Sequence, residues 1–530
     1  MNKKLVTITK SLAKAKFKSR LDLVKLKKKL SNQLKMNAPL NSDLLRIYKN
    51  LLAKKIILPN KTLEQLLCKR EIRTLSGVAV ITVLTKPYPC PGQCIYCPSE
   101  KDMPKSYLKN EPAAARAFAT KFDPFVQTKV RLDALKINGH STDKIELIVL
   151  GGSFSAYPKN YQAWFIKRCF EALNKKPAKN LATAQKQNET ALHRCVGLTL
   201  ETRPDMITPK EIERMRNLGC TRVELGVQTI YDPILKLNKR GQTVKQTIEA
   251  TKMLKAAGFK VMYHLMPNLP GSNLKLDLKM FKEIFSGPNF QPDLLKIYPC
   301  VVTKNSVLYH WYRQKKFKSY SDKELKNLLI KVKRLIPQYV RITRLIRDIP
   351  AESIIAGNKI TNLRQLIAQD FKGCKCIRCR EAGHSLGIKN YEAGIRKKSS
   401  SIIHNSCFII QKYKASGGTE YFLSYDSKDK KILYAFLRLR INGDINNNFI
   451  PELKGAALIR ELHTYGQMAQ LGQIGKVQHL GLGKMLLAQA ETIAKKQKIK
   501  KIAVISGIGV RQYYKKFGYH LAGTYMLKNL

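Results

Sequence analysis

Three cysteines with the spacing C-x3-C-x2-C lie in the segment Pro87-Tyr88-Pro89-Cys90-Pro91-Gly92-Gln93-Cys94-Ile95-Tyr96-Cys97-Pro98. Three thiolates on one short loop can bind three irons of a 4Fe-4S cluster. The fourth iron then has no protein ligand and keeps an open position for chemistry. An electron-carrying ferredoxin site needs four cysteines per cluster. A zinc ion with its fourth ligand elsewhere in the chain is the alternative for this loop.

Short apolar segments alternate with helical ones around this loop. We expect strands at 78–84, 146–150, 196–200, 222–227, 260–265 and 294–298, and helices at 161–173, 209–218, 243–257 and 277–285. This alternation predicts a parallel (βα) barrel of about six units, which is too few to close. The cysteine loop follows the C-terminal end of the first strand, where such barrels carry their chemistry. The polar stretch 174–193 is predicted to be a mobile insertion.

The charge of the chain points to a polyanionic partner. The 97 Lys and Arg residues outnumber 37 Asp and Glu residues, which gives a net charge of +60. A fold does not need this excess, so we expect nucleic acid as a partner, ahead of an anionic membrane surface.

Residues 1–70 carry 19 basic residues against three acidic ones, a net charge of +16. Leu21, Val24, Leu26 and Leu30 recur there at roughly helical intervals among lysines, which predicts a basic amphipathic helical region that binds RNA phosphates. A merely solvated charged arm is the alternative.

The 12 cysteines indicate a reducing compartment. Six lie in two tight clusters and six are scattered singly, unlike a disulfide framework. The basic N-terminus lacks the apolar run of a signal peptide, and no stretch approaches the roughly 20 apolar residues of a membrane span. We therefore predict a cytoplasmic protein without a membrane partner.

A second cysteine cluster comprises Cys374, Cys376 and Cys379. Three cysteines in six residues can bind zinc, and His384 is the nearest candidate for the fourth ligand. A second iron–sulfur cluster is the alternative, although no strand end precedes these residues. We predict a structural zinc site whose fourth ligand stays open.

A second domain is predicted after Lys397-Lys398-Ser399-Ser400-Ser401, with strands at 420–424, 432–439 and 455–462. Gln478-His479-Leu480-Gly481-Leu482-Gly483 then leads into a helix at 484–495 and offers backbone N–H groups and a helix dipole to a pyrophosphate. A strand at 501–506 and the stretch Tyr513-Tyr514-Lys515-Lys516-Phe517-Gly518-Tyr519 follow. This order matches the coenzyme A fold of the GNAT acetyltransferases.

With both halves in one chain, the sequence resembles the catalytic subunit of Elongator and its stand-alone bacterial and archaeal relatives, from about Arg73 to the C-terminus. The motifs that carry the resemblance are Arg73-Thr74-Leu75-Ser76-Gly77-Val78-Ala79-Val80, Phe122-Asp123-Pro124-Phe125, Tyr263-His264-Leu265-Met266-Pro267, Arg347-Asp348-Ile349-Pro350, Arg460-Glu461-Leu462-His463 and Ile502-Ala503-Val504-Ile505-Ser506-Gly507. Residues 1–70 match only in being basic.

The resemblance implies an α/β fold in which a partial (βα)6 radical-SAM barrel precedes a GNAT acetyltransferase domain and follows a basic helical N-terminal region. The domains expected are 1–72 for tRNA binding, 73–350 for the barrel, 351–400 for a zinc-binding linker and 401–530 for the acetyltransferase. The implied activity is an acyltransferase reaction that forms carboxymethyluridine at C5 of the anticodon wobble uridine in tRNA. The implied cofactors are S-adenosylmethionine (SAM), a 4Fe-4S cluster, acetyl-CoA and, from the second cysteine cluster, zinc.

The resemblance also implies roles in the barrel. Cys90, Cys94 and Cys97 are expected to bind the cluster, and Gly151 and Gly152 to contact the SAM amino group through their backbone, unless they form only a tight turn. The weaker candidates are Glu201, Arg203, Gln228 and His264, for which hydrogen bonding at the barrel mouth is the alternative.

In the acetyltransferase half, the resemblance implies that the backbone of Glu461, Leu462, His463 and Thr464 holds the acetyl and pantetheine arm. It implies Leu482, Gly483 and Lys484 as the pyrophosphate turn, Tyr514 as a proton donor beside the coenzyme sulfur and Lys144 as a barrel lysine associated with acetyl-CoA. An aromatic core residue is the alternative for Tyr514, and an ordinary surface lysine is the alternative for Lys144.

Two other functions stay open on the sequence. One is a protein lysine acetyltransferase that uses its barrel as a binding platform, against which the net charge of +60 argues. The other is an RNA-binding scaffold with degenerate sites, against which the intact cysteine triad and pyrophosphate turn argue. A homodimer is left open, and a stand-alone enzyme would need no partner subunits. We expect the two halves to pack face to face, with the cysteines near residue 376 as a hinge staple.

Overall fold

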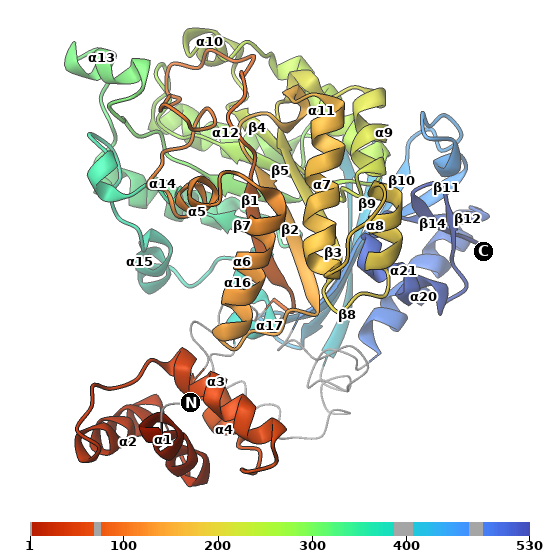
Figure 1. The fold of residues 1–530 in the computed structure, drawn as a ribbon. Helices are drawn as coiled ribbons and strands as arrows, with labels where there is room; N and C mark the ends of the chain where they lie inside the picture. Colours follow the sequence, from red (N-terminus) through yellow and green to blue (C-terminus); the bar gives the residue numbers. More distant parts are fainter. Residues whose placement is uncertain (1–2, 18, 68–75, 386–405, 466–480) are drawn as a thin grey trace.

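The computed structural model describes residues 3–17, 19–67, 76–385, 406–465 and 481–530. In this part of the chain, a group of helices precedes two sheets of seven strands each. Figure 1 shows helices around the first sheet and the second sheet beside it, toward the C-terminus. No helix in the described residues is long and apolar enough to cross a membrane. The expected domain boundaries at 72 and 400 lie outside the described residues.

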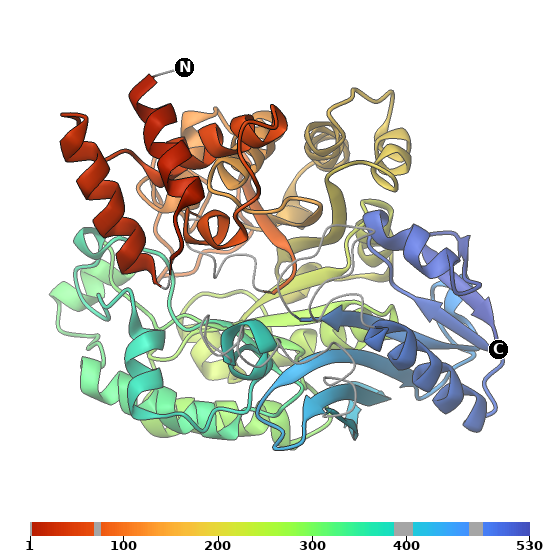
Figure 2. The ribbon, with the colours of Figure 1, turned by 90° about the horizontal axis from the view of Figure 1, so that it is seen from below.

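The N-terminal helices form a bundle with a core of its own. They are α1 (Lys3–Lys14), α2 (Arg20–Gln33), α3 (Asn41–Ala53) and α4 (Lys61–Leu67). Figure 1 shows them as a separate group below the barrel, and Figure 2 shows the same helices, in red, from below. Leu12, Leu44 and Tyr48 are buried between them. The bundle contacts the barrel through α3.

The helical prediction for this bundle is confirmed, but the predicted apolar face of α2 is partly wrong. Leu21 and Val24 are 59% and 49% exposed, whereas Leu23 is buried. Leu23, Leu26 and Leu30 follow the spacing i, i+3, i+7 and face the core together. Lys25, Lys28 and Lys29 are exposed, whereas Lys27 is half-buried and donates to the Pro39 carbonyl (3.1 Å).

The first sheet is an open parallel barrel. Its strands are β1 (Ala79–Leu84), β2 (Lys144–Leu150), β3 (Arg194–Thr202), β4 (Arg222–Gln228), β5 (Lys260–Leu265), β6 (Leu294–Ile297) and β7 (Arg341–Arg344), paired in chain order. The six predicted strands are confirmed. The seventh was missed because β7 has only four residues, of which Ile342 alone is apolar and buried.

Helices connect the strands along the outside. They are α5 (Pro112–Ala119), α6 (Pro124–Ile137), α7 (Lys159–Asn174), α8 (Leu181–Asn188), α9 (Pro209–Asn217), α10 (Asp232–Leu237), α11 (Val244–Ala256), α12 (Leu274–Ser286), α13 (Val307–Arg313) and α14 (Asp322–Leu335). The short helices α15 (Leu363–Asp370), α16 (Ile377–Arg380) and α17 (Ala382–Ser385) follow the last strand. The helix predictions at 161–173, 209–218, 243–257 and 277–285 are confirmed.

The prediction of a mobile insertion at 174–193 is wrong, because the stretch contains the packed helix α8. Asn188 is fully buried, donates to the His193 carbonyl (3.0 Å) and accepts from the Cys195 amide (2.7 Å). Glu189 binds Arg511 and Gln512 of the second sheet's half of the chain. The polar side chains of this stretch therefore join two parts of the protein.

The second sheet is mixed. It contains β8 (Ser406–Ala415), β9 (Gly418–Ser427), β10 (Leu433–Asn442), β11 (Ala456–Thr464), β12 (Lys501–Val504), β13 (His520–Ala522) and β14 (Tyr525–Asn529) in the order β13-β14-β12-β11-β10-β9-β8. Only β11 and β12 pair in parallel, and α20 (Leu482–Lys496) lies between them in the chain. The predicted strands and helix are confirmed, and the sheet agrees with an acetyltransferase-like half.

The second sheet covers the end of the barrel where its strands begin. His463 binds the carbonyl of Ser76 before β1 (2.7 Å), and Lys260 at the start of β5 binds Glu461 (3.2 Å). The cysteine loop follows the other end of β1. The two halves therefore pack together as expected, but the loop opens away from the second sheet.

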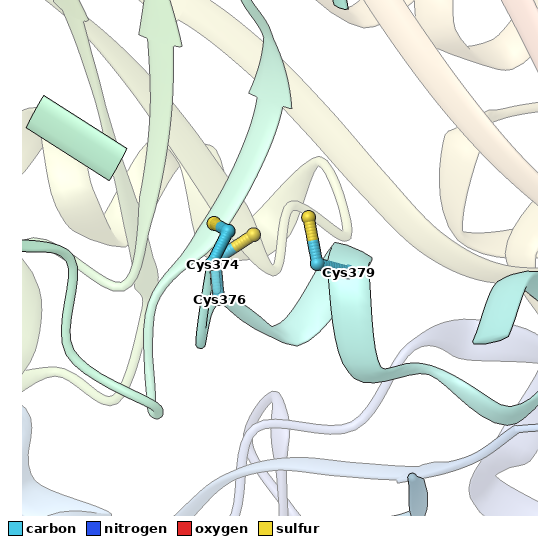
Figure 3. Close-up of side chains that lie close together, drawn as sticks. All are labelled: Cys374, Cys376 and Cys379. Carbon is cyan, nitrogen blue, oxygen red and sulfur yellow. The ribbon is translucent and has the colours of Figure 1, made fainter. Parts of the chain in front are cut away.

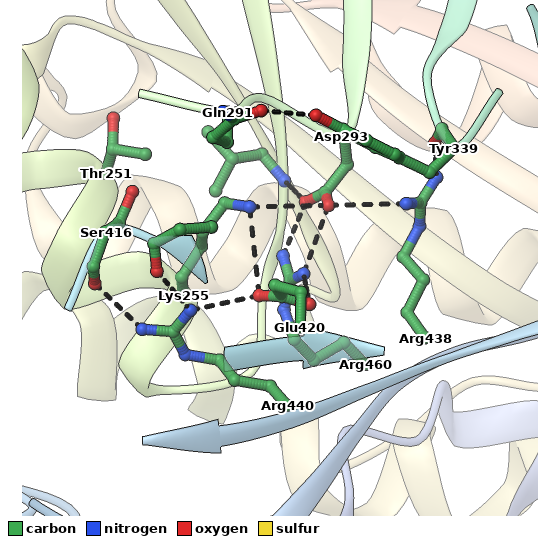
Figure 4. Close-up of polar contacts among 12 residues, drawn as sticks. Thr251, Lys255, Gln291, Asp293, Tyr339, Ser416, Glu420, Arg438, Arg440 and Arg460 are labelled. Atoms are coloured by element: carbon green, nitrogen blue, oxygen red, sulfur yellow. Dashed lines mark hydrogen bonds and ion pairs between the residues drawn. The ribbon is translucent and has the colours of Figure 1, made fainter. Parts of the chain in front are cut away.

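A buried ionic network fixes this contact. Asp293 and Lys255 of the barrel meet Glu420 of β9, Arg440 of β10 and Arg460 of β11 (Figure 4). Arg460 donates to Asp293 (3.1 Å) and to Glu420 (2.8 Å). All five side chains are almost completely buried. Breaking such a network leaves an unpaired charge buried away from water, so separating the two halves costs free energy.

Candidate functional site

Aromatic side chains from the next βα unit hold the first cysteine loop. The Tyr157 hydroxyl donates to the Lys86 carbonyl (2.6 Å) and binds the Thr85 hydroxyl (2.8 Å). Tyr88 stacks on the same Tyr157 ring with centroids 4.8 Å apart. Farther along, the Ile95 amide donates to the Asn238 carbonyl. The loop has no regular secondary structure but is anchored on both sides.

All three thiols of this loop line one cavity of about 600 Å³. Cys94 is buried, and Arg240 Nη1 lies 3.4 Å from its sulfur. A hydrogen bond from Cys97 and the charge of Arg240 lower the pKa of Cys94 to about 4. Cys97 donates that hydrogen bond, which raises its own pKa. Because the thiolate is the metal-binding form of cysteine, Arg240 favours metal binding at this loop.

Gly151 and Gly152 are required to be glycine for different structural reasons. Gly151 has φ +127°, and a Cβ there would lie 2.0 Å from the Thr85 hydroxyl, so no side chain fits. Gly152 has φ +65° and lines the cavity, where the nearest atom to an added Cβ is 3.9 Å away. The second glycine thus exposes backbone to the cavity, as a close-approaching ligand requires.

The structure brings the four weaker candidates to the same cavity, since Glu201, Arg203, Gln228 and His264 all line it. Arg203 is held by Asp205 (2.9 Å), and a Cβ at Gly92 of the cysteine loop would lie 2.2 Å from its Nη1 atom.

Gln228 has a backbone strain that suits a functional position. Its φ of +69° is in the left-handed region, which non-glycine residues rarely adopt. Its buried Oε1 atom has no hydrogen-bond partner among the described residues. Strained residues persist where the surrounding structure determines them, often in ligand sites.

Charged residues inside the barrel form a chain that the sequence reasoning missed. His264 binds Glu224 through Nε2 (2.8 Å), and Glu224 also forms an ion pair with Lys296. Burial alone raises the pKa of Glu224, but the Lys296 ammonium and His264 together lower it well below its ordinary value. On the mouth side, the Tyr107 hydroxyl donates to Glu201 (3.1 Å). The barrel interior therefore contains a fixed carboxylate, a fixed ammonium and an imidazole.

The predicted coenzyme residues of the second sheet also come together. Gly481, with φ +87°, precedes α20, and Leu482 and Gly483 form its first turn. A Cβ at Gly483 would lie 2.7 Å from the Tyr513 hydroxyl and 3.9 Å from Leu462. Gln478, His479 and Leu480 of the predicted turn lie outside the described residues.

Tyr514, the predicted proton donor, lies in α21 (Arg511–Lys515) and is buried in the core of the second sheet. Burial raises its pKa above the ordinary value, with Tyr513 and Glu461 as further causes. The hydroxyl therefore stays protonated at neutral pH and can donate a hydrogen bond.

Lys144 lies at the first residue of β2, far along the strand from the cysteine loop. It pairs in register with Arg194, which contacts Gly509 of the acetyltransferase half. Burial lowers its pKa. The structure thus places Lys144 at the end of the barrel that the second sheet covers.

The second cysteine cluster is preformed. The sulfur atoms of Cys374, Cys376 and Cys379 all lie within 4.8 Å of one another (Figure 3). The amide of Ile377 donates to the Val340 carbonyl (2.9 Å), which ties the cluster to the start of β7. Three converging thiols are a typical donor set for zinc. The side chain of His384, the candidate fourth ligand, lies outside the part of the chain that the structure describes.

Two comparisons with sequence families agree with this geometry. The Radical SAM superfamily matches residues 88–282, and the Radical_SAM C-terminal domain matches residues 292–372. The superfamily implies SAM and a 4Fe-4S cluster.

The chain is 48% identical to the "tRNA uridine(34) acetyltransferase" of Methanocaldococcus infernus over 507 residues, which cover 93% of this chain and 92% of that protein. It is 39% identical to human "Elongator complex protein 3" over 489 residues, which cover 89% of this chain and 87% of that protein.

A solved structure agrees as well. The archaeal Methanocaldococcus infernus Elp3 with an N-terminal deletion matches with a TM-score of 0.75 and 45% identity, covering 86% of this chain and 100% of that one. The cysteine loop, the parallel barrel and these relatives together show that the chain belongs to the radical SAM family of tRNA uridine(34) acetyltransferases and Elongator complex protein 3.

Proposed function

We propose that this protein forms 5-carboxymethyluridine at the wobble position of tRNA from SAM and acetyl-CoA. The observation that carries the proposal is one cavity with three cysteines at its mouth and an acetyltransferase-like sheet fixed across its other end. Both chemistries are thereby held in one rigid unit.

Cys90, Cys94 and Cys97 would bind the 4Fe-4S cluster. The donor set fits, because the three thiols share one cavity, Arg240 favours the thiolate of Cys94, and no fourth cysteine is among the described residues that line this cavity. When bound, the cluster supplies the electron that cleaves SAM. With three cysteines for four irons, these residues would leave one iron open to the SAM amino and carboxylate groups.

SAM would be held by groups that point into the cavity near the loop. The backbone of Gly152, which lines the cavity directly after Gly151, suits its amino group, and the unpartnered Oε1 of Gln228 suits a hydroxyl donor. Glu201, Arg203 and His264 would orient the rest of the molecule.

Acetyl-CoA would be bound by the second sheet and the first turn of α20. The residues proposed are Lys144, Glu461, Leu462, His463, Thr464, Leu482, Gly483, Lys484 and Tyr514. The N-terminus of a 15-residue helix offers its amide groups and dipole to the pyrophosphate. Tyr514, which stays protonated, would donate its proton to the coenzyme thiolate as the thioester is hydrolysed.

The substrate would be tRNA, as the names of the relatives state for those proteins. The net charge of +60 supports a polyanion, and the basic N-terminal bundle would bind its phosphates. We further propose that Cys374, Cys376 and Cys379 bind structural zinc, and that the enzyme works in the cytoplasm without partner subunits, as a monomer or homodimer.

Mass spectrometry of tRNA nucleosides tests the proposal. Wild-type protein expressed in cells that lack the modification should produce carboxymethyluridine, and Cys94→Ala should abolish it. Cys407→Ala is the matched control, because Cys407 lies in β8, where its thiol contacts only backbone carbonyls.

A protein lysine acetyltransferase is the alternative that this experiment excludes. If Cys94→Ala protein acetylates lysines at the full rate and the wild type never alters tRNA, the proposed function is wrong. A Tyr514→Phe variant adds a second readout, since it keeps the ring packing and should lower tRNA-dependent thioester hydrolysis roughly 100-fold, as loss of a general acid does.

A further inference from the structure

Four aromatic side chains, here called the aromatic row, lie in contact with one another beside the barrel cavity. Tyr88 of the cysteine loop stacks on Tyr157 with ring centroids 4.8 Å apart, and Tyr157 stacks on Tyr161 at 5.1 Å. Trp164 of α7 continues the row, with its centroid 5.5 Å from that of Tyr161. Tyr88 is two residues before Cys90, which lines the cavity, so their Cα atoms are at most about 7 Å apart. The row therefore begins at the edge of the cavity.

The inner rings of the row hold the cysteine loop, whereas the end rings are open to solvent. The Tyr157 hydroxyl donates to the Lys86 carbonyl (2.6 Å), and the Tyr161 hydroxyl accepts from the Lys86 amide (3.2 Å). Tyr88 and Trp164 are 38% and 42% exposed. Anchoring of the loop thus accounts for the inner pair and leaves the exposed surfaces of the end rings available to a ligand.

Tyr88 is fixed in place before any ligand arrives. It lies between Pro87 and Pro89. Each proline has a locked φ, and Pro89 also restricts Tyr88 itself to extended backbone conformations. The Tyr157 ring supports Tyr88 from one side. A ring held in this way loses little conformational entropy when a flat ligand stacks on it.

The charge around the row favours a nucleic acid over a protein as the ligand. The two stretches that supply the rings, 86–99 and 151–170, carry four basic residues and no acidic one. Lys86 is exposed, with its Nζ atom 5.1 Å from the centroid of the Tyr161 ring, and Lys159 is exposed in the first turn of α7. Proteins that bind single-stranded nucleic acid combine stacking aromatic rings with cations that contact the phosphates.

The position of the row beside the cavity suggests which base it binds. An enzyme that modifies a base inside a pocket must take that base out of its stack, and this costs free energy. The neighbouring base then loses a stacking partner as well. An aromatic ring directly outside the cavity can replace that partner, as rings do for the unstacked bases of RNA loops.

We infer that the aromatic row is a stacking platform for the unpaired RNA base next to the one that enters the cavity. Tyr88 stacks on this base, and Lys86 and Lys159 contact the adjacent phosphates. The inference rests on the proposed function, because it takes the anticodon loop of tRNA as the RNA.

Fluorescence of a labelled tRNA tests the platform without a loaded cluster or turnover. The full-length protein is titrated with tRNA that carries 2-aminopurine next to its wobble uridine, on the 5' side in one preparation and on the 3' side in another. We expect the wild type to quench one of the two labels by stacking. Tyr88→Ala should lose this quenching and bind at least about fivefold more weakly, whereas Tyr88→Trp should keep both. The salt dependence of binding should not change in Tyr88→Ala, because no charge is removed.

Leu192→Ala is the matched control, since it also removes an exposed apolar side chain (66%) but lies just before β3, at the opposite end of the barrel strands from the cysteine loop. It should leave quenching and affinity unchanged. Equal quenching and equal affinity in the wild type and Tyr88→Ala would overturn the platform and leave the proposed function intact. Failure of the wild type to bind either tRNA would overturn the proposed function and the platform together. Self-association of the protein that Tyr88→Ala abolishes, with tRNA binding unchanged, would assign the row to a protein contact and also overturn the inference.

Discussion

Removing one arginine from the buried network between the two halves should destabilise the whole protein. Arg460→Met keeps the length of the side chain but removes its charge and its hydrogen bonds to Asp293 (3.1 Å), Glu420 (2.8 Å) and the Phe259 carbonyl (2.6 Å). Both carboxylates are fully buried. The substitution therefore leaves two desolvated anions with one cation fewer.

The expected magnitude follows from what remains around the carboxylates. Breaking a buried ion pair costs about 3–5 kcal/mol. Lys255 still lies 3.6 Å from Asp293 and 3.8 Å from Glu420, so we expect the lower end, about 3 kcal/mol. With an m-value of about 3 kcal/mol/M in urea, this cost lowers the midpoint of unfolding by about 1 M.

Urea unfolding followed by circular dichroism measures this shift. Lys431→Met is the control, since it removes a cation from the turn between β9 and β10, where the side chains of Lys431 and its partner Asp429 are 82% and 55% exposed. An exposed pair contributes about 0–1 kcal/mol, so the control should shift the midpoint by at most about 0.3 M. Equal shifts in the two variants would refute the reasoning that the network fixes the two halves.

Three further predictions concern other parts of the protein. Burial lowers the pKa of Lys255 from 10.5 to about 8, so between these pH values the unfolded chain binds more protons than the folded one. The free energy of unfolding should therefore rise with pH in this range, by up to about 3 kcal/mol. Lys255→Met should flatten this pH dependence in denaturation experiments. Deleting residues 1–67, which carry 17 basic and three acidic residues, should weaken tRNA binding and flatten its salt dependence in filter-binding assays, whereas unchanged values would identify a solvated arm. Cys376→Ser should lose the zinc measured by elemental analysis, whereas Cys407→Ser should keep it, and equal zinc in both would contradict the assigned site.

Much of the fold could be predicted because local sequence patterns indicate the individual strands and helices. Apolar strands such as 260–265 alternate with helical segments, and the cysteine loop directly follows a strand. The errors have physical causes. Leu21 and Val24 have helical spacing but face solvent, because Leu23 sets the buried face. The polar stretch 174–193 looks unstructured because its order depends on Asn188 and Glu189, which find their partners only in the folded chain.

In the candidate site, too, some features could be predicted from the sequence and others depend on the folded chain. The cysteines and glycines follow from spacing, and the cavity brings Gln228 and His264 to them. Glu224 and Lys296 could not be predicted, because a charged residue within an apolar strand gives no indication of its partner. Only the register of β4, β5 and β6 brings them together around His264.

Isotope transfer from the acetyl group tests most directly whether the two halves carry out one reaction. Reduced enzyme is incubated with SAM, tRNA and acetyl-CoA whose acetyl methyl group is fully deuterated, and the nucleosides are analysed by mass spectrometry. We expect carboxymethyluridine that retains two of the three deuterium atoms, with the third in 5'-deoxyadenosine. Unlabelled 5'-deoxyadenosine together with tRNA that carries no carbon from the acetyl group, or an intact acetyl group on protein lysines instead, would contradict it.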